Sequence, residues 1–185
     1  MKHHRYKKDY QFVKEPIEFN KYTDRQILQY CLGATLYMPA TKMITEKIIN
    51  DKFQGLTSIV MCFEDAISEE QLPEAEKNVF ELLNTLSNEI ESERISLNDI
   101  PLIFFRVRSP EHFKEFSEKI QERQTKIIAG FVFPKFTTYN GYEYLSHLKE
   151  LNTKYDDILY GMPILESKRI AFKERFIFNF FNYHI

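Results

Sequence analysis

Five short apolar segments, separated by longer segments with helical periodicity, are the feature that most restricts what this chain can fold into. The apolar segments are 34–39 (ATLYMP), 58–63 (SIVMCF), 102–107 (LIFFRV), 127–133 (IIAGFVF) and 158–165 (ILYGMPIL). They show little alternation of apolar and polar residues, which is typical of strands covered on both faces. Strands that alternate with helices predict βαβ units around a parallel sheet.

The segments between these strands carry apolar residues three or four positions apart, as amphipathic helices do. Ser109 followed by Pro110 predicts a helix start, and Asn140-Gly141 predicts a turn before the last helix. The three apolar stripes are Leu72, Ala75, Val79, Leu82, Leu86 and Ile90; Phe113, Phe116 and Ile120; and Leu145, Leu148 and Leu151. Each stripe predicts one helix packed against the sheet.

The sequence divides into a basic leader, residues 1–30, and one domain, residues 31–185. The leader starts MKHHRYKKDYQF and lacks the apolar core of a secretory signal; one helix is expected near 24–32. No apolar run is long enough to cross a bilayer, so no membrane partner is expected. The final segment, 175–185 (RFIFNFFNYHI), fits neither helical nor strand spacing and is an aggregation hazard.

Composition excludes several classes of function. The formal net charge of -2 gives no positive field for nonspecific nucleic-acid binding. With only Cys31 and Cys62, the chain has no disulfide framework, which favours a reducing, cytoplasmic location. Nucleotide cradles of the GxGxxG and GxxxxGK[ST] types are absent, as are HExxH and GxSxG. We expect His112 and His147 at the surface of helices rather than as catalytic bases.

Polar residues follow each predicted strand, at the end where parallel α/β folds bind ligands. In chain order they are Lys42, then Glu64 and Asp65, then Arg106 and Arg108, then Lys135, and Glu166. Carboxylates and cations on one rim suit a hard divalent cation and an anionic substrate. The alternative is that they are solvated loop residues or caps, with Asp65 capping the next helix. Arg106 interrupts an apolar run, where an unpaired charge is costly, so it needs a partner.

The phrases ATLYMPATK, SIVMCFEDAI, LIFFRVR, GFVFPK and MPILES resemble, in this order and spacing, the citrate lyase beta subunit-like group of the HpcH/HpaI aldolase family. More narrowly, they are similar to its branch of carbon-carbon bond lyases found with tellurium-resistance genes. The resemblance covers about residues 30–170 and implies a (β/α)8 TIM barrel. Since a full barrel takes roughly 250 residues, we expect a truncated barrel with about five βα units.

The resemblance also implies a role for each residue at the strand ends. Arg106 matches the arginine of the family's RVN motif, which stabilises an enolate oxygen, and Glu166 matches the glutamate that ligates Mg²⁺. Glu64 and Asp65 match an acidic pair that holds metal-bound water or orients the arginine. Substrate binding falls to Lys42, Arg106, Arg108 and Lys135. Lys42 stands where many relatives have arginine, and Arg108 replaces the RVN asparagine.

These matches imply a Mg²⁺- or Mn²⁺-dependent carbon-carbon bond lyase acting on a small anionic oxo or hydroxy acid or its CoA thioester. The family's second metal carboxylate, in a GxxD phrase after Glu166, is missing, so we expect little or no activity from this chain. One alternative is a noncatalytic anion-binding module in a stress-response assembly. Another is an inactive remnant whose open barrel edges favour homo-oligomers.

Overall fold

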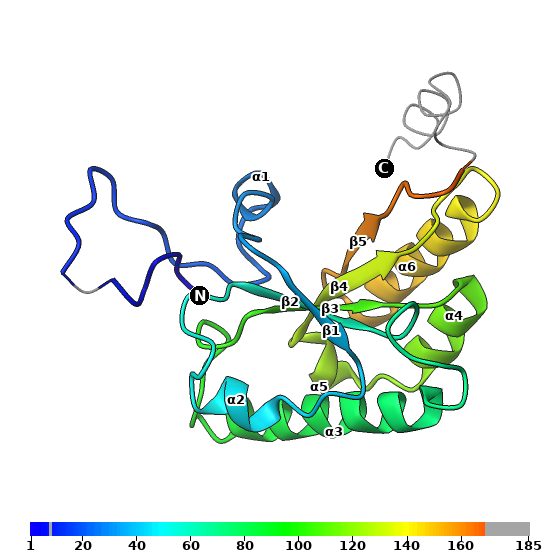
Figure 1. The fold of residues 1–185 in the computed structure, drawn as a ribbon, viewed down its shortest axis with the longest axis horizontal. Helices are drawn as coiled ribbons and strands as arrows, with labels where there is room; N and C mark the ends of the chain where they lie inside the picture. The colour runs from blue at the N-terminus through cyan, green and yellow to red at the C-terminus, as the bar shows by residue number, and fades with distance from the viewer. Residues whose placement is uncertain (8, 169–185) are drawn as a thin grey trace.

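The computed structural model describes residues 1–7 and 9–168, which form one parallel sheet with helices (Figure 1). The strands lie in the order β1-β2-β3-β4-β5. They are β1 (Leu36–Pro39), β2 (Ser58–Cys62), β3 (Leu102–Arg106), β4 (Ile128–Phe133) and β5 (Tyr160–Pro163). The helices are α1 (Arg25–Leu28), α2 (Thr45–Ile49), α3 (Leu72–Glu91), α4 (Pro110–Glu118), α5 (Glu122–Thr125) and α6 (Gly141–Tyr155).

Every neighbouring pair of strands is parallel, and strand order follows chain order without reversal. Helices α2, α3, α4 and α6 pack on one face of the sheet, because their buried apolar side chains share a single core with Ile59, Met61, Phe105 and Phe131. A doubly wound sheet reverses its strand order and carries helices on both faces. The observed arrangement is that of successive βα units of a barrel, as the family resemblance implies.

The N-terminal segment covers the opposite face of the sheet. Met1, Phe19 and Leu28 are buried there in a second core with Val60 of β2 and Phe104 of β3. Within residues 1–30, α1 begins after Asp24, whose carboxylate accepts a hydrogen bond from the Gln26 backbone N–H. Met1, Phe19 and Leu28 therefore pack on the face that a closed barrel turns inward.

A buried ion pair attaches this segment to the sheet. Lys21 Nζ lies 3.1 Å from an Asp157 carboxylate oxygen, and the two side chains are 3% and 8% exposed. The ammonium also donates to the Thr125 carbonyl at 2.6 Å, and Thr125 Oγ1 donates to Asp157 at 2.7 Å. Lys21 thus joins the N-terminal segment to the residues just before β4 and β5.

All five predicted strands are present and begin or end within two residues of the predicted bounds. The start of α4 is also confirmed, because Ser109 accepts a hydrogen bond from the His112 N–H and Pro110 is the first helical residue. Two short helices, α2 and α5, were not predicted, because four or five residues carry too little periodicity. The segment 175–185 lies outside the described residues. No helix in the described chain is long and apolar enough to cross a membrane.

One expectation is wrong, and one alternative is excluded. His112 is not at the surface: it is 6% exposed, its ring packs against Phe63, and its Nδ1 accepts a hydrogen bond from the Arg108 N–H. Asp65 does not cap the next helix, because α3 begins only at Leu72 and its N-cap is Gln71. The carboxylate of Asp65 is engaged elsewhere.

Candidate active site

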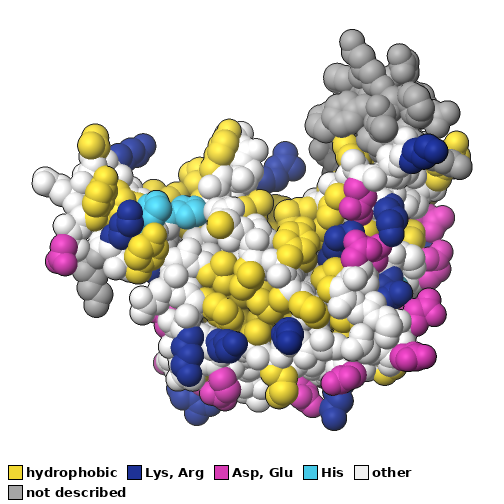
Figure 2. Space-filling view, viewed as in Figure 1, with side chains coloured by type: hydrophobic (Ala, Val, Ile, Leu, Met, Phe, Trp, Pro, Cys, Tyr) yellow, Lys and Arg dark blue, Asp and Glu magenta, His cyan; other side chains and the backbone are white. Residues whose placement is uncertain are grey.

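The carboxyl ends of four neighbouring strands bring together charged side chains from loops far apart in sequence. Arg106 is the last residue of β3, and Glu64 and Asp65 follow β2. Lys135 follows β4, and Glu166 follows β5. Because parallel strands all end at one edge of the sheet, these side chains converge. Figure 2 shows acidic and basic side chains intermixed on the side toward which the strands of Figure 1 point.

One nitrogen of Arg106 is the centre of this cluster. Its Nη2 lies 2.6 Å from Glu64 Oε2, 2.9 Å from Asp65 Oδ2 and 2.9 Å from Glu166 Oε1. A guanidinium Nη carries two hydrogens, and both are donated, to Asp65 and Glu166. Glu64 Oε2 is buried and accepts no hydrogen bond. The prediction that Arg106 has a carboxylate partner is confirmed, with three carboxylates instead of one.

The rest of the guanidinium has no protein acceptor in the described chain. Arg106 Nε is buried without a hydrogen-bond partner. Nη1 donates to no described residue. It is therefore the guanidinium group that the described carboxylates leave unused.

Lys135 connects two of the same carboxylates. Its Nζ donates to Glu64 Oε1 at 2.5 Å, and its backbone N–H donates to Glu166 Oε1 at 3.1 Å. The residue has a φ of 49°, in the left-handed region that costs a non-glycine residue roughly 1–2 kcal/mol. In this backbone conformation, both the N–H and the side chain of Lys135 contact the cluster. Strained backbone conformations are often found at functional sites.

Burial and charge act in opposite directions on Arg106. Burial disfavours the charged guanidinium, but Glu64 and Glu166 outweigh it, so the pKa of Arg106 is raised. The hydrogen bond to Glu64 raises the pKa of Lys135. Three carboxylates against two cations leave the cluster with one net negative charge.

Tyr37 of β1 belongs to the surroundings of this cluster and was missed by the sequence reasoning. Burial raises the pKa of its hydroxyl, while Arg106 lowers it and Glu166 raises it. The side chain is 48% exposed. In the sequence Tyr37 is one aromatic residue in an apolar run, and such residues are usually core. Only the edge position of β1 leaves it open to solvent beside Arg106.

Two of the predicted substrate-binding residues lie apart from the cluster. Arg108 Nη1 donates to the backbone carbonyls of Phe63 and Ile67, at 2.9 and 3.4 Å, and so braces the loop that carries Glu64 and Asp65. Lys42 is exposed, and no contact joins its ammonium to the cluster within the described chain. The buried Asn78 holds the Lys42 loop by donating to the Ala40 and Lys42 carbonyls.

The donor set of the cluster fits a hard divalent cation. All its acidic ligands are carboxylate oxygens, which Mg²⁺ and Mn²⁺ prefer, and the cluster has a net negative charge. Glu166 is 34% exposed and Asp65 63% exposed, so a cation has access from solvent. In the present arrangement of the described chain, no three His, Cys, Asp or Glu side chains are placed to hold a metal ion. Arg106 Nη2 lies where the three carboxylates converge.

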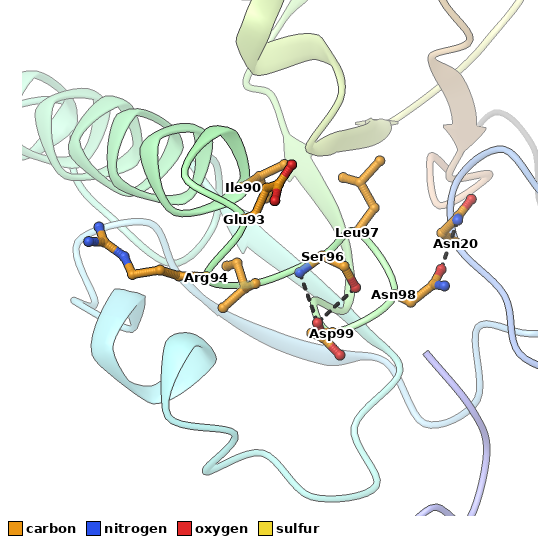
Figure 3. Close-up of a pocket in the computed structure, with 9 residues that line it drawn as sticks. Asn20, Ile90, Glu93, Arg94, Ser96, Leu97, Asn98 and Asp99 are labelled. Atoms are coloured by element: carbon orange, nitrogen blue, oxygen red, sulfur yellow. Dashed lines mark hydrogen bonds between the residues drawn. The ribbon is translucent and has the colours of Figure 1, made fainter.

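A pocket lies at the opposite end of β3 from the charged cluster. It has a volume of about 490 Å³ and is lined by Asn20 and by residues of the loop between α3 and β3 (Figure 3). Its polar side chains are largely satisfied by one another: Asn20 donates to Asn98, and Ser96 donates to Asp99. This end of the strand is remote from the charged cluster.

Comparison with known proteins agrees with the fold. No curated protein matches this chain. A family model described as carbon-carbon bond lyase of the TIM-barrel fold matches residues 26–179. The match includes all five strands and every residue of the cluster. The chain therefore belongs to the carbon-carbon bond lyase family of the TIM-barrel fold.

Proposed function

We propose that the cluster around Arg106 is the site of a Mg²⁺-dependent carbon-carbon bond lyase of the citrate lyase beta subunit-like, HpcH/HpaI type. The substrate is an oxo or hydroxy acid or its CoA thioester. The observation that carries this proposal is the convergence of three carboxylates on Arg106 at the carboxyl ends of the strands, in a member of a lyase family.

Cleavage of a carbon-carbon bond next to a carbonyl moves the bonding electron pair onto the carbonyl oxygen, which becomes an enolate. A positioned cation that meets this developing charge lowers the barrier. Arg106 has such a donor in Nη1, which no described residue occupies. We assign Arg106 the stabilisation of the enolate oxygen.

Glu166, assisted by Glu64 or Asp65, would hold the Mg²⁺ or Mn²⁺ ion. When bound, the ion supplies positive charge that polarises the substrate carbonyl. Lys135 keeps Glu166 and Glu64 in place through its N–H and its ammonium. Lys42, exposed on the loop after β1, attracts the anionic substrate.

Slow turnover is part of the proposal. The described residues offer no ready group of three metal ligands, and Arg106 already occupies the carboxylates. Cation binding has to displace this guanidinium, which weakens the site. We expect enolate formation to be detectable before net bond cleavage is.

The test is exchange of methyl protons with solvent. Pyruvate and acetyl-CoA serve as probes in D₂O with Mg²⁺, and proton NMR follows the loss of the methyl signal. The proposal predicts slow exchange that needs Mg²⁺ and falls at least about tenfold in Arg106→Gln. The matched control is Arg123→Gln on α5, an arginine that contacts Asn84 and Asn88 instead of the cluster.

Two results would count against a lyase. Exchange that is equal in wild type and Arg106→Gln means that Arg106 does not stabilise an enolate. Anion binding with no exchange at any Mg²⁺ concentration favours instead a noncatalytic anion-binding module, the second function that the cationic residues allow.

A further inference from the structure

The contacts of Arg106 Nη2 exceed what a guanidinium nitrogen can satisfy. Three carboxylate oxygens lie within 2.6 to 2.9 Å of a nitrogen with two hydrogens. The closest of them, Glu64 Oε2, is buried and accepts no hydrogen bond. Several carboxylates around one point is the arrangement that a multivalent cation satisfies better than one N–H group.

We propose that Arg106 is an internal counterion that competes with a divalent cation for the carboxylates, so that cation binding moves its guanidinium off Glu166 and frees Nη2 for the substrate. The inference rests on the proposed function, because it assumes that these carboxylates bind the metal ion. It adds a coupling between cation binding and substrate binding. Arg106 blocks the cation site while that site is empty, and it contacts the substrate once the site is filled.

Movement of the Arg106 guanidinium away from the cluster would leave no buried carboxylate without a partner. Glu64, the most buried carboxylate at 9% exposure, keeps its ion pair with Lys135 Nζ. Glu166 Oε1, which Arg106 would release, keeps the hydrogen bond from the Lys135 N–H. Asp65 is 63% exposed and can be solvated. Lys135 therefore holds the carboxylates in position while the guanidinium moves.

The guanidinium itself is anchored by little besides these carboxylates. All its hydrogen bonds in the described chain run from Nη2 to Asp65 and Glu166, and Nε has no partner. Its neighbours in register, Cys62 on β2 and Val132 on β4, offer no carboxylate or amide. A cation that takes over the carboxylates would remove the contacts that fix its position.

The test measures cation affinity and needs no turnover. Free Mn²⁺ is counted by electron paramagnetic resonance during titration of wild type, Arg106→Gln, Arg123→Gln and Glu166→Gln, and Mg²⁺ competition shows that both ions use one site. Removing a unit positive charge a few ångströms from the ion is expected to tighten binding at least about tenfold. Arg123→Gln should match wild type, and Glu166→Gln should bind weakly.

Equal or weaker Mn²⁺ binding by Arg106→Gln overturns the inference, as does the absence of binding in both proteins. A second measurement uses wild-type protein and does not depend on the folding of Arg106→Gln. The side-chain Nε resonance of Arg106, assigned with Arg106→Lys, should shift as Mg²⁺ is added, and no shift at saturation overturns the inference.

The two proposals can fail separately. Mn²⁺ affinity that is unchanged by Arg106→Gln removes the competition but leaves the lyase site intact. Tighter Mn²⁺ binding by Arg106→Gln, together with no methyl exchange in wild type, supports the competition and refutes the lyase chemistry.

Discussion

Replacing Lys21 by methionine removes the ammonium that joins the N-terminal segment to the residues just before β4 and β5. Methionine keeps most of the length and apolar stem of lysine, so the main loss is the charge and its hydrogen bonds. In Lys21→Met, the Asp157 carboxylate, 8% exposed, is left without its cation, and the Thr125 carbonyl loses its donor.

The expected cost follows from that burial. Breaking a buried ion pair on one side typically costs about 3–5 kcal/mol, because the remaining charge is uncompensated. Asp157 keeps hydrogen bonds from Thr125 Oγ1 and from the Ile158 N–H, both at 2.7 Å, so the lower end applies. About 3 kcal/mol corresponds to a drop in Tm of roughly 6–12 °C for a domain of this size.

Thermal unfolding followed by circular dichroism measures this drop. The matched control is Lys77→Met, since Lys77 is 77% exposed and its pair with Glu81 should contribute less than about 1 kcal/mol. The double variant Lys21→Met/Asp157→Asn should recover at least about half of the loss, because no buried charge remains. A Tm for Lys21→Met equal to that of wild type would refute the reasoning, and so would a double variant no more stable than the single one.

Three further predictions concern the elements that position the site. In Gly130→Ala a Cβ would lie 2.0 Å from the Tyr160 carbonyl oxygen, so β5 must shift, and urea unfolding should show a loss of more than about 2 kcal/mol. Asn78→Ala should cost about 1–3 kcal/mol in the same assay, because the Ala40 carbonyl loses its buried donor. Burial lowers the pKa of His112 against the opposing effect of Glu76, so the unfolded chain binds the proton more tightly. The Tm of wild type should therefore decrease as the pH falls below about 6.5, and it should decrease more than the Tm of His112→Asn. Parallel curves of Tm against pH for the two proteins would contradict this.

Much of the fold could be predicted because the strands carry the signal themselves. The central strands β2, β3 and β4 are apolar on both faces, since one face meets the helices and the other meets the N-terminal segment. Arg106 was predicted to need a partner for the same reason, as a charge inside such a run. The convergence of acidic and basic side chains on one rim could also be predicted, because parallel strands bring their carboxyl ends to one edge.

The remaining features depend on contacts that no local pattern encodes. Met1 and Phe19 are single apolar residues in a charged segment, and their burial follows only from where the sheet lies. Arg108 and Arg106 are two positions apart, yet Arg108 braces the loop after β2 by contacting backbone carbonyls. The left-handed backbone of Lys135 has no sequence signal, because lysine rarely adopts it.

Central to the proposed function is the binding of a divalent cation together with an enolate-like anion at the Arg106 cluster. Calorimetric titration with oxalate, a planar dianion that resembles the enolate of pyruvate, tests this claim most directly. We predict that oxalate binds only in the presence of Mg²⁺ and that both Arg106→Gln and Glu166→Gln abolish the binding. Oxalate binding that is independent of Mg²⁺, or that persists in both variants, would contradict the account.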